Sequence, residues 1–533
     1  MKNEASTIHG FMESGCLGLI SARHPAYLPD NWKTAAYDGD QEEDNSKRLP
    51  DVISITEYRL KIQPYYPAPG IQYDKKKNLT FDGTVEMSVL IKKPTTEITL
   101  NAANLNISSV ELSDFLHREV KIKSKSVDER KEFLTIVLEK QPTVGSLLIL
   151  KIMYTGLINF YNNGGLYYTT YQQPNGETLW MIATQLAVYW ARTVFPCMDE
   201  PAYKAVYRLD LIYPSSHVAL ANMKESAAVD LRNGWSKISF PATPIMSTYL
   251  VAFAVGPFVS HDVINRDGTL VRSWGWTGQE NFLQFSAETA AECLYQMGQY
   301  TNIKFPLEKC DNLGLPEFLA GAMENFGLIV YKSEIIALNP DTITTMEKIE
   351  SAYVICHEVA HQWFGNLVTT HWWDDLFLNE GTATYFSRIM MAAAFPKETS
   401  YVDAVTVRRD REKALRADAG AFVHPLVAPD GPYFDLITYE KGGILFRMLS
   451  DVMGSEVLRN GFQRYLRTHQ YSTASHRDLF SSLTEVSPQV FYDDDSLKSL
   501  LKKMRTDDVP VGVKIALIGD ELAFIQYVHS ADK

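Results

Sequence analysis

The stretch VICHEVAHQWF, residues 354–364, decides how the rest of this 533-residue chain is interpreted. It places two histidines, His357 and His361, four positions apart, and Glu358 directly follows the first. In an α-helix, residues i and i+4 lie on one face, so both imidazoles can reach the same metal ion. This HExxH spacing predicts two zinc ligands, with Glu358 beside them as a general base. By itself the motif also fits an ordinary buried helix whose histidines pack in a core.

A third candidate ligand favours the metal site. Glu380, in the triplet Asn379-Glu-Gly381, follows His361 by 19 positions. Catalytic zinc usually has three protein ligands and one water, so Glu380 completes a His, His, Glu set. Gly365 offers an end to the first helix where the chain must turn back. We therefore predict one Zn²⁺ per chain, bound by His357, His361 and Glu380.

The predicted chemistry follows from these ligands. Zinc lowers the pKa of its bound water to about 7. Glu358 can then take a proton as that water attacks a carbonyl carbon, and can pass the proton to the leaving amine. The sequence therefore predicts amide hydrolysis without a covalent intermediate.

The composition is that of an ordinary globular protein, with 46% hydrophobic and 22% charged residues. The net charge of −13 argues against a nucleic-acid partner, which normally requires a basic surface. At about 100–200 residues per domain, the length predicts roughly two to four domains.

The five cysteines are widely spaced and form no CxxC pair. We therefore expect mostly reduced or buried thiols, and neither a disulfide framework nor a cysteine zinc site. The N-terminal residues show neither a secretion signal nor an apolar run of the roughly 20 residues that a membrane span needs. These features favour a cytoplasmic protein. The alternative is a secretory or membrane-associated protein, if this form lacks an N-terminal segment, and the sequons at Asn78 and Asn106 matter only then.

Four parts are predicted along the chain. Residues 1–50 are polar and acidic, and we expect a poorly ordered arm. Residues 51–258 show period-two alternation interrupted by Pro, Gly and Asn clusters, which predicts a β-rich domain. Residues 259–508 have mainly helical patterns. Residues 509–533 are typical of a β-hairpin that begins a third, truncated β domain.

Individual elements are expected within these parts. Thr344 and Glu347 offer a capping box at the start of the helix that carries the metal motif. The hairpin should turn at Gly519 and Asp520. Strands are expected at 85–89, 98–100, 135–138, 147–150 and 249–253. Helices are expected at 281–301, 344–365, 375–394 and within 435–486, with some β structure near 327–336.

Further motifs accompany HEVAH and NEG. Residues 321–325 read GAMEN, 195–201 read FPCMDEP, 246–253 read MSTYLVAF and 437–442 read ITYEKG. With these motifs, the chain from about residue 51 to 510 resembles the M1 family of zinc aminopeptidases, and in particular its aminopeptidase N-like members. The resemblance implies a multidomain α+β fold. A β-rich, saddle-like N-terminal domain would precede a thermolysin-like, mainly helical zinc-protease domain.

The resemblance also implies roles for matching positions. The three metal ligands and the base Glu358 keep the roles given above. Glu324, in GAMEN, would bind the free α-amino group of the substrate, and Tyr439 would donate its hydroxyl to the developing oxyanion. The backbone of the loop would hold the peptide as an extended strand through Gly321, Ala322, Met323 and Asn325.

The chain departs from the family pattern near the predicted amine site. Ala187 stands where members usually carry a Gln or Glu that contacts the amine, and Trp190 stands where an Asp often follows. Gln185 could substitute if the strand shifted by two residues, which would keep the same face. Loss of a hydrogen bond to a charged group costs about 1.5–3 kcal/mol, so we expect a slower enzyme and unchanged metal binding. The large C-terminal helical domain of the family is also missing from this sequence.

These features predict a zinc-dependent metalloaminopeptidase that releases the N-terminal residue of peptides with a free N-terminus. The alternative is a catalytically weak, peptide-binding member of the same fold, which Ala187 and the missing domain favour. Nothing in the sequence speaks for the lipid-epoxide hydrolysis of one family branch. An endopeptidase is disfavoured, because the carboxylate of GAMEN would face an internal peptide bond.

Overall fold

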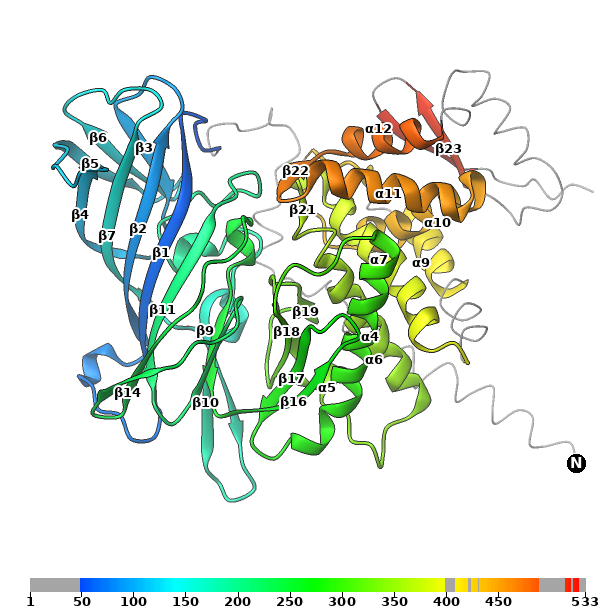
Figure 1. The fold of residues 1–533 in the computed structure, drawn as a ribbon, viewed down its shortest axis with the longest axis horizontal. Helices are drawn as coiled ribbons and strands as arrows, with labels where there is room; N and C mark the ends of the chain where they lie inside the picture. Colours follow the sequence, from blue (N-terminus) through cyan, green and yellow to red (C-terminus); the bar gives the residue numbers. More distant parts are fainter. Residues whose placement is uncertain are drawn as a thin grey trace, which may run out of the picture.

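A computed structural model of the chain describes residues 48–397, 408–419, 423–429 and 431–487, and the backbone of 513–518 and 521–526. A β-rich half, residues 48–257, lies beside a mainly helical half, residues 258–487 (Figure 1). The predicted order of these two parts is therefore confirmed. Most of the predicted N-terminal arm lies outside the described residues.

The largest sheet of the β-rich half has seven strands in the order β13-β14-β11-β1-β2-β7-β4. In β2 every second residue from Phe81 to Ile91 is buried, so one face of the strand covers the core. This pattern confirms the strand predicted at 85–89. The strands are β1 (Ile53–Tyr65), β2 (Thr80–Ile91), β4 (Asn106–Asp114), β7 (Leu147–Leu157), β11 (Val206–Pro214), β13 (Val229–Arg232) and β14 (Trp235–Ser239).

Two smaller sheets complete the β-rich half, in the orders β3-β6-β5 and β12-β15-β10-β9-β8. The strands predicted at 98–100, 135–138 and 147–150 lie in β3, β6 and β7 and are confirmed. The additional strands are β3 (Glu97–Asn101), β5 (Ile122–Asp128), β6 (Phe133–Leu138), β8 (Asn159–Phe160), β9 (Gly165–Gln172), β10 (Thr178–Gln185), β12 (Val218–Ala221) and β15 (Phe253–Gly256).

The prediction of a strand at 249–253 is wrong for most of these residues. Residues Thr248–Leu250 form a 3-10 helix, and β15 begins only at Phe253. The amide of Asn222 takes the place of a neighbouring strand: its Nδ2 donates to the carbonyl of Leu250 (2.8 Å) and its Oδ1 accepts from the N–H of Ala252 (2.8 Å). Side-chain hydrogen bonds of this kind compete with a regular ladder and are not readable from apolar alternation.

The helical half also contains a mixed sheet that the sequence patterns did not predict in full. Its strand order is β16-β17-β18-β20-β19, with β17, β18 and β20 parallel. Every residue of β18 is buried, including Lys309, Asp311 and Asn312, so the strand shows neither the alternation of a half-exposed strand nor the apolar run of an ordinary buried one. The strands are β16 (Phe258–Ile264), β17 (Leu270–Trp276), β18 (Lys309–Leu315), β19 (Ala322–Met323) and β20 (Leu328–Lys332).

The predicted helices are present, with small shifts at their ends. Thr344 caps the helix of the metal motif: its side chain accepts from the N–H of Glu347, and the Glu347 carboxylate accepts from the N–H of Thr344. The helices are α4 (Gln284–Thr301), α5 (Ser333–Ile336), α6 (Thr345–His361), α7 (Phe377–Ala394), α9 (Arg408–Asp418), α10 (Gly442–Met453), α11 (Ser455–His469) and α12 (His476–Val486), and a π-helical turn spans Ile437–Lys441.

Four short strands complete the description. Strands β21 (Val368–Thr370) and β22 (Ser472–Ala474) pair in parallel, and β23 (Val513–Ile518) pairs antiparallel with β24 (Glu521–Gln526). The second pair confirms the predicted hairpin. Its expected turn, Gly519 and Asp520, lies outside the described residues.

Polar contacts connect the two halves, which share one continuous hydrophobic core. The Tyr249 hydroxyl donates to the carbonyl of Gly365 (3.2 Å), and Lys204 Nζ donates to the carbonyl of Asn366 (3.3 Å). The β-rich half therefore helps to fix the turn that follows α6, the helix of the metal motif.

The cysteines depart from the expectation. Cys293 of α4 and Cys356 of α6 form a disulfide with a Cα–Cα distance of 5.6 Å. The expectation of reduced thiols is therefore wrong for this pair, whereas Cys197 and Cys310 are free and buried. The partners are 63 positions apart and meet only because α4 packs on α6, so no local spacing revealed them.

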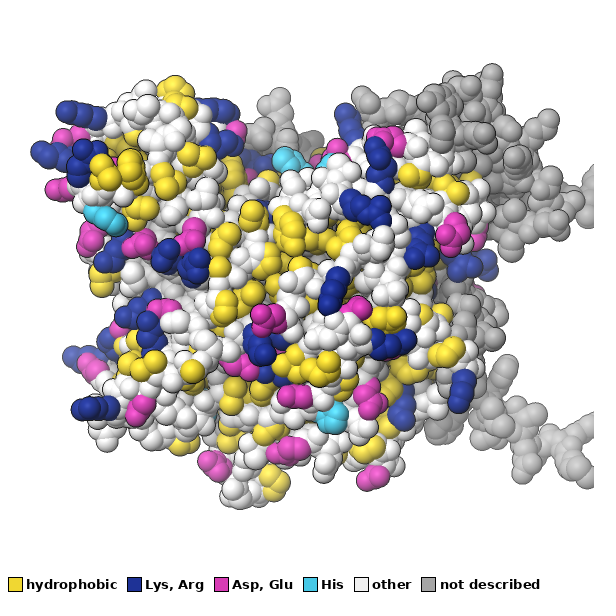
Figure 2. All heavy atoms as spheres, viewed as in Figure 1, with side chains coloured by type: hydrophobic (Ala, Val, Ile, Leu, Met, Phe, Trp, Pro, Cys, Tyr) yellow, Lys and Arg dark blue, Asp and Glu magenta, His cyan; other side chains and the backbone are white. Residues whose placement is uncertain are grey.

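On the face drawn in Figure 2, acidic and basic side chains of the described residues are interspersed rather than segregated by sign. No helix among the described residues combines the length and the apolar character needed to cross a bilayer.

Candidate metal centre

His357 and His361 of α6 and Glu380 of α7 form the one group of three metal-capable ligands in the described part of the chain. The two Nε2 atoms are 3.0 Å apart, and Oε2 of Glu380 lies 3.3 Å from His357 Nε2 and 3.2 Å from His361 Nε2. Ligand atoms bound tetrahedrally at about 2.0–2.2 Å lie about 3.3–3.5 Å from one another. All three side chains are buried, and their spacing fits a zinc-sized cation.

The helices place these ligands by regular geometry. His357 and His361 are one turn apart on α6, and Glu380 lies in the first turn of α7, which packs against α6. Nδ1 of His361 donates to the carbonyl of Phe364 (3.0 Å), which fixes the tautomer and leaves Nε2 available as a metal ligand. Gly365 has φ +128°, which is rare for other residues, and allows the turn predicted after the helix.

Glu358 lies on the same helix between the two histidines and is also buried, with 6% of its surface exposed. Burial raises the pKa of its carboxyl well above the usual range, and although His361 opposes the rise, Glu324 and Glu380 add to it. A buried carboxyl with a raised pKa beside a metal site has the character of a general base.

Glu324 lies in a loop that we call the GAMEN loop, residues 321–327. Ala322 and Met323 form β19, which pairs with β20 and lies at one end of its sheet. Glu324 is 8% exposed, and burial raises its pKa, opposed by the charge of His361 and reinforced by that of Glu380. The loop therefore places a carboxylate beside the metal ligands, next to the short strand that ends the described sheet.

The structure also brings Tyr439 to the centre. It lies in the π-helical turn, a feature that is frequent at functional sites. Its ring stacks on His357 with centroids 5.8 Å apart and planes at 14°, and its hydroxyl is hydrogen-bonded to Glu380. Burial raises its pKa well above 10, and nearby carboxylates reinforce the shift. The hydroxyl therefore stays protonated at neutral pH and can donate a hydrogen bond.

The region that departs from the family pattern lies at the end of β10. Gln185 is the last residue of that strand and is buried, and its Oε1 makes no hydrogen bond within the described residues. Ala187 is partly buried. A Cβ added at Gly164 would lie 2.6 Å from the Trp190 ring, so this indole packs on the Gly164 backbone. A role of Gln185 in amine recognition stays a prediction.

Sequence reasoning missed the polar residues that surround the GAMEN loop. Gln362 and Asn366, both fully buried, are hydrogen-bonded to the carbonyl of Glu324. The available signal in the sequence was that both residues closely follow the metal ligand His361, so the helix and its turn would bring them near the site. Lys309 and Asn222, which contact the end of the loop, gave no local signal because they lie far from it in the sequence: Lys309 begins β18, and Asn222 directly follows β12.

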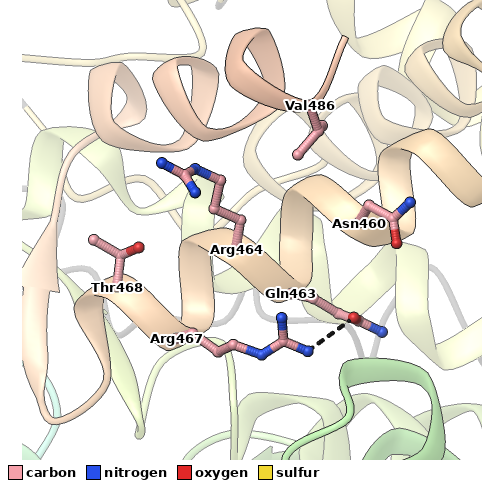
Figure 3. A pocket seen from close by; sticks show the side chains of 6 residues that line it. All are labelled: Asn460, Gln463, Arg464, Arg467, Thr468 and Val486. Carbon is pink, nitrogen blue, oxygen red and sulfur yellow. Dashed lines mark hydrogen bonds between the residues drawn. The ribbon is translucent and has the colours of Figure 1, made fainter.

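A separate surface pocket lies over α11 and the end of α12 (Figure 3). Its two arginines have partners: Arg464 pairs with Glu485, and Arg467 Nη2 donates to Gln463 Oε1 (3.1 Å). None of its lining residues belongs to the metal-binding group or to the GAMEN loop. The lining residues are Asn460, Gln463, Arg464, Arg467, Thr468 and Val486.

Comparison with known proteins agrees with this geometry. Residues 55–250 match the peptidase M1 N-terminal domain, and residues 285–504 match the peptidase family M1 domain. The chain is 47% identical to "Putative aminopeptidase-2" of Caenorhabditis elegans over 491 residues, which cover 91% of this chain and 26% of that protein. It is 34% identical to "Aminopeptidase N" of Haemonchus contortus, over 85% of this chain and 48% of that protein.

A third relative, "Puromycin-sensitive aminopeptidase" of C. elegans, is 32% identical over 83% of this chain and 46% of that protein. The chain thus spans half or less of the length of these relatives. The two domain matches follow the β-rich and helical halves in order, and the second contains all three metal-capable residues. On these grounds the chain belongs to the M1 family of peptidases.

Proposed function

We propose that this chain is a zinc-dependent aminopeptidase that hydrolyses the first peptide bond of substrates with a free N-terminus. One observation carries the proposal. A buried His, His, Glu group lies beside two further buried carboxylates, Glu358 and Glu324, which can serve as base and amine acceptor. The names of the relatives, all aminopeptidases, support the same activity.

The donor set supports zinc as the cation. Two imidazole nitrogens and one carboxylate oxygen, with a fourth position for water, are typical of catalytic zinc sites. Three carboxylates share this buried region, and a dication would offset the cost of keeping them charged. Zinc held by His357, His361 and Glu380 would supply a water of lowered pKa and would polarise the scissile carbonyl.

Glu358 would move the proton. As the water oxygen forms a bond to the carbonyl carbon, the Glu358 carboxylate accepts one water proton. It then delivers that proton to the amide nitrogen as the C–N bond breaks, which releases a free amino acid and a shortened peptide. Burial favours the protonated form of this carboxyl, and the zinc would favour its charged form, so the group can both accept the proton and release it.

Tyr439 would stabilise charge that develops on the carbonyl oxygen. Its hydroxyl is protonated at neutral pH and lies beside Glu380. A donor directed at a developing oxyanion contributes about 10²–10³ in rate.

Glu324 would select a free amine. A carboxylate recognises an ammonium group by a charge-assisted hydrogen bond. Strand β19, at the end of its sheet, offers an edge along which an extended peptide can add as a further strand. The substrate would then enter with its N-terminus at Glu324 and its first peptide bond at the metal.

The test uses the purified 533-residue chain. We expect one zinc per chain by elemental analysis, and hydrolysis of an aminoacyl amide that stops with a chelator and returns with added zinc. N-acetylation of the substrate should prevent hydrolysis. Bound zinc without turnover would favour a peptide-binding protein, and a folded chain that binds no zinc would refute the proposal.

We also propose that the chain folds in an oxidising compartment, the second of the two locations considered from the sequence. The support is the Cys293–Cys356 disulfide, since such bonds persist mainly in secreted and secretory-pathway proteins. Alkylation of the protein unfolded in urea without reductant should leave both cysteines unmodified, and free thiols at these positions would contradict the location.

A further inference from the structure

Two buried amide side chains connect the GAMEN loop to the helix that carries the metal ligands. Gln362 directly follows His361; its Nε2 donates to the carbonyl of Glu324 (3.0 Å), and its Oε1 accepts from the N–H of Gly327 (3.1 Å). Nδ2 of Asn366 donates to the same Glu324 carbonyl (2.8 Å). Both amides are fully buried, so these hydrogen bonds do not compete with water.

The end of the loop is also held by side chains from both halves of the molecule. Asn222 Nδ2 donates to the carbonyl of Phe326 (2.9 Å), and Lys309 Nζ donates to that of Gly327 (2.7 Å). Gly327 has φ +77°, and a Cβ there would lie 2.5 Å from the Asn222 carbonyl oxygen. The end of the loop therefore has little freedom to move as a unit. Among the side chains that the structure describes, those of Gln362 and Asn366 are the two that hydrogen-bond to Glu324 itself.

From this arrangement we infer that Gln362 is a positioning residue that sets the distance between the amine acceptor Glu324 and the metal ligands. The inference rests on the proposed aminopeptidase function. Consecutive residues of an extended peptide are about 3.3–3.6 Å apart. The position of the amine acceptor relative to the metal must therefore vary by less than this spacing, because a larger shift would bring a different peptide bond to the metal. Because Gln362 is next to His361, Glu324 cannot shift relative to the metal without lengthening the hydrogen bonds of this one side chain.

The two amides differ in what their loss would leave behind. Without Gln362, the carbonyl of Glu324 keeps Asn366, but the N–H of Gly327 loses the Oε1 that accepts its hydrogen bond. Without Asn366, both hydrogen bonds of Gln362 to the loop remain. Replacement of Gln362 should therefore affect amine recognition more than replacement of Asn366.

The test measures binding without turnover, in the 533-residue chain carrying Glu358→Gln. The probes are dialanine and N-acetyldialanine, and affinity is measured by calorimetry on the zinc-loaded protein. Gln362→Met, which keeps the length of the side chain but removes its hydrogen bonds, should weaken dialanine binding about tenfold. Zinc content and N-acetyldialanine binding should not change.

Two further variants make the result specific. Burial would keep the carboxyl of Gln362→Glu protonated, so this variant retains an acceptor for the N–H of Gly327 and a hydroxyl donor for the carbonyl of Glu324. Its loss of dialanine affinity should therefore be smaller than that of Gln362→Met, and it also serves if Gln362→Met does not fold. Gln284→Met, on the exposed side of α4, is the matched control and should bind both probes as the parent does. In the active background, Gln362→Met should raise KM several-fold more than it lowers kcat.

The outcomes separate the two proposals. If the parent prefers dialanine and both Gln362 variants keep that preference in full, the positioning role is wrong and the aminopeptidase proposal stands. If the parent itself does not distinguish the two probes, the aminopeptidase proposal fails, and the inference that rests on it fails too.

Discussion

Gly381 and Gly442 bring two helical segments into backbone contact: a Cβ on Gly381 would lie 2.9 Å from Cα of Gly442. Gly381 directly follows the metal ligand Glu380 on α7, and Gly442 begins α10 directly after the π-helical turn that contains Tyr439. No side chain separates the two segments at this point. The pair therefore sets how closely the Tyr439 hydroxyl approaches Glu380.

Gly381→Ala should destabilise the fold and reduce activity together. The added methyl group cannot be accommodated without moving the backbone of Gly442, and overpacking of this kind costs about 1–3 kcal/mol. Denaturant unfolding and hydrolysis of an aminoacyl amide are the measurements. Gly298→Ala is the matched control, because the nearest atom to its Cβ is 3.5 Å away and helix propensity favours alanine. Equal stability of the two variants would contradict the packing argument.

Glu358→Gln should retain the metal and lose nearly all hydrolysis. Glu358 is not among the three metal-capable ligands, and glutamine keeps its shape but cannot accept the proton. We expect kcat to fall about 10²–10⁴-fold, with zinc content unchanged by elemental analysis. Glu288→Gln, on the exposed face of α4, is the control. Turnover close to the parent value would rule out Glu358 as the base.

The metal centre was the most predictable part of this molecule, because it depends on short-range geometry. His357, Glu358 and His361 lie within two turns of one helix, and a capping box marks where that helix begins. The position of Glu380 followed from the usual number of zinc ligands. Tyr439 and Glu324 required the family resemblance, because neither an isolated tyrosine nor an isolated glutamate carries such information.

Other features depend on contacts between distant segments and were not predictable. Strand β18 is buried on both faces yet contains Lys309, Asp311 and Asn312, so neither regular alternation nor an apolar run marked it as a strand. The Cys293–Cys356 pair and the contacts of Lys309 with the GAMEN loop exist only once helices and strands have packed. The prediction of a strand at 249–253 was wrong because the side chain of Asn222, rather than a neighbouring strand, hydrogen-bonds to the backbone of these residues.

Ala187→Gln should increase kcat/KM for substrates with a free amine. The family pattern places an amine-contacting amide at this position, and one hydrogen bond to a charged group contributes about 1.5–3 kcal/mol, equivalent to about tenfold or more. The gain should be absent for an N-acetylated analogue, which serves as the control probe. Unchanged kinetics would mean that another group already makes this contact.

His217 should make the stability of the β-rich half depend on pH. Burial lowers the pKa of this histidine to about 4, and its Nδ1 is hydrogen-bonded to the Tyr66 hydroxyl (2.7 Å). The unfolded chain binds a proton near pH 6.5 that the folded chain does not bind until about pH 4. Stability from the neutral form is therefore complete above pH 6.5 and is lost as the pH falls towards 4.

Between pH 7 and pH 5 this group should lower the free energy of unfolding by about 2 kcal/mol. His217→Gln keeps a hydrogen-bonding side chain but does not titrate in this range. Urea unfolding at both pH values should show a smaller loss in this variant than in the parent. An identical pH dependence would show that His217 is not the group responsible.

Tyr439→Phe should lower kcat and leave KM and zinc content nearly unchanged. The phenylalanine ring can keep the stacking on His357, whose centroid lies 5.8 Å from that of Tyr439, so only the hydroxyl is removed. Because that hydroxyl would act on the oxyanion formed during reaction, its loss should cost about 10²–10³ in kcat. Tyr168→Phe, in the β-rich half, is the control. A rise in KM with unchanged kcat would instead assign Tyr439 to substrate binding, since the lost interaction would then exist before the reaction begins.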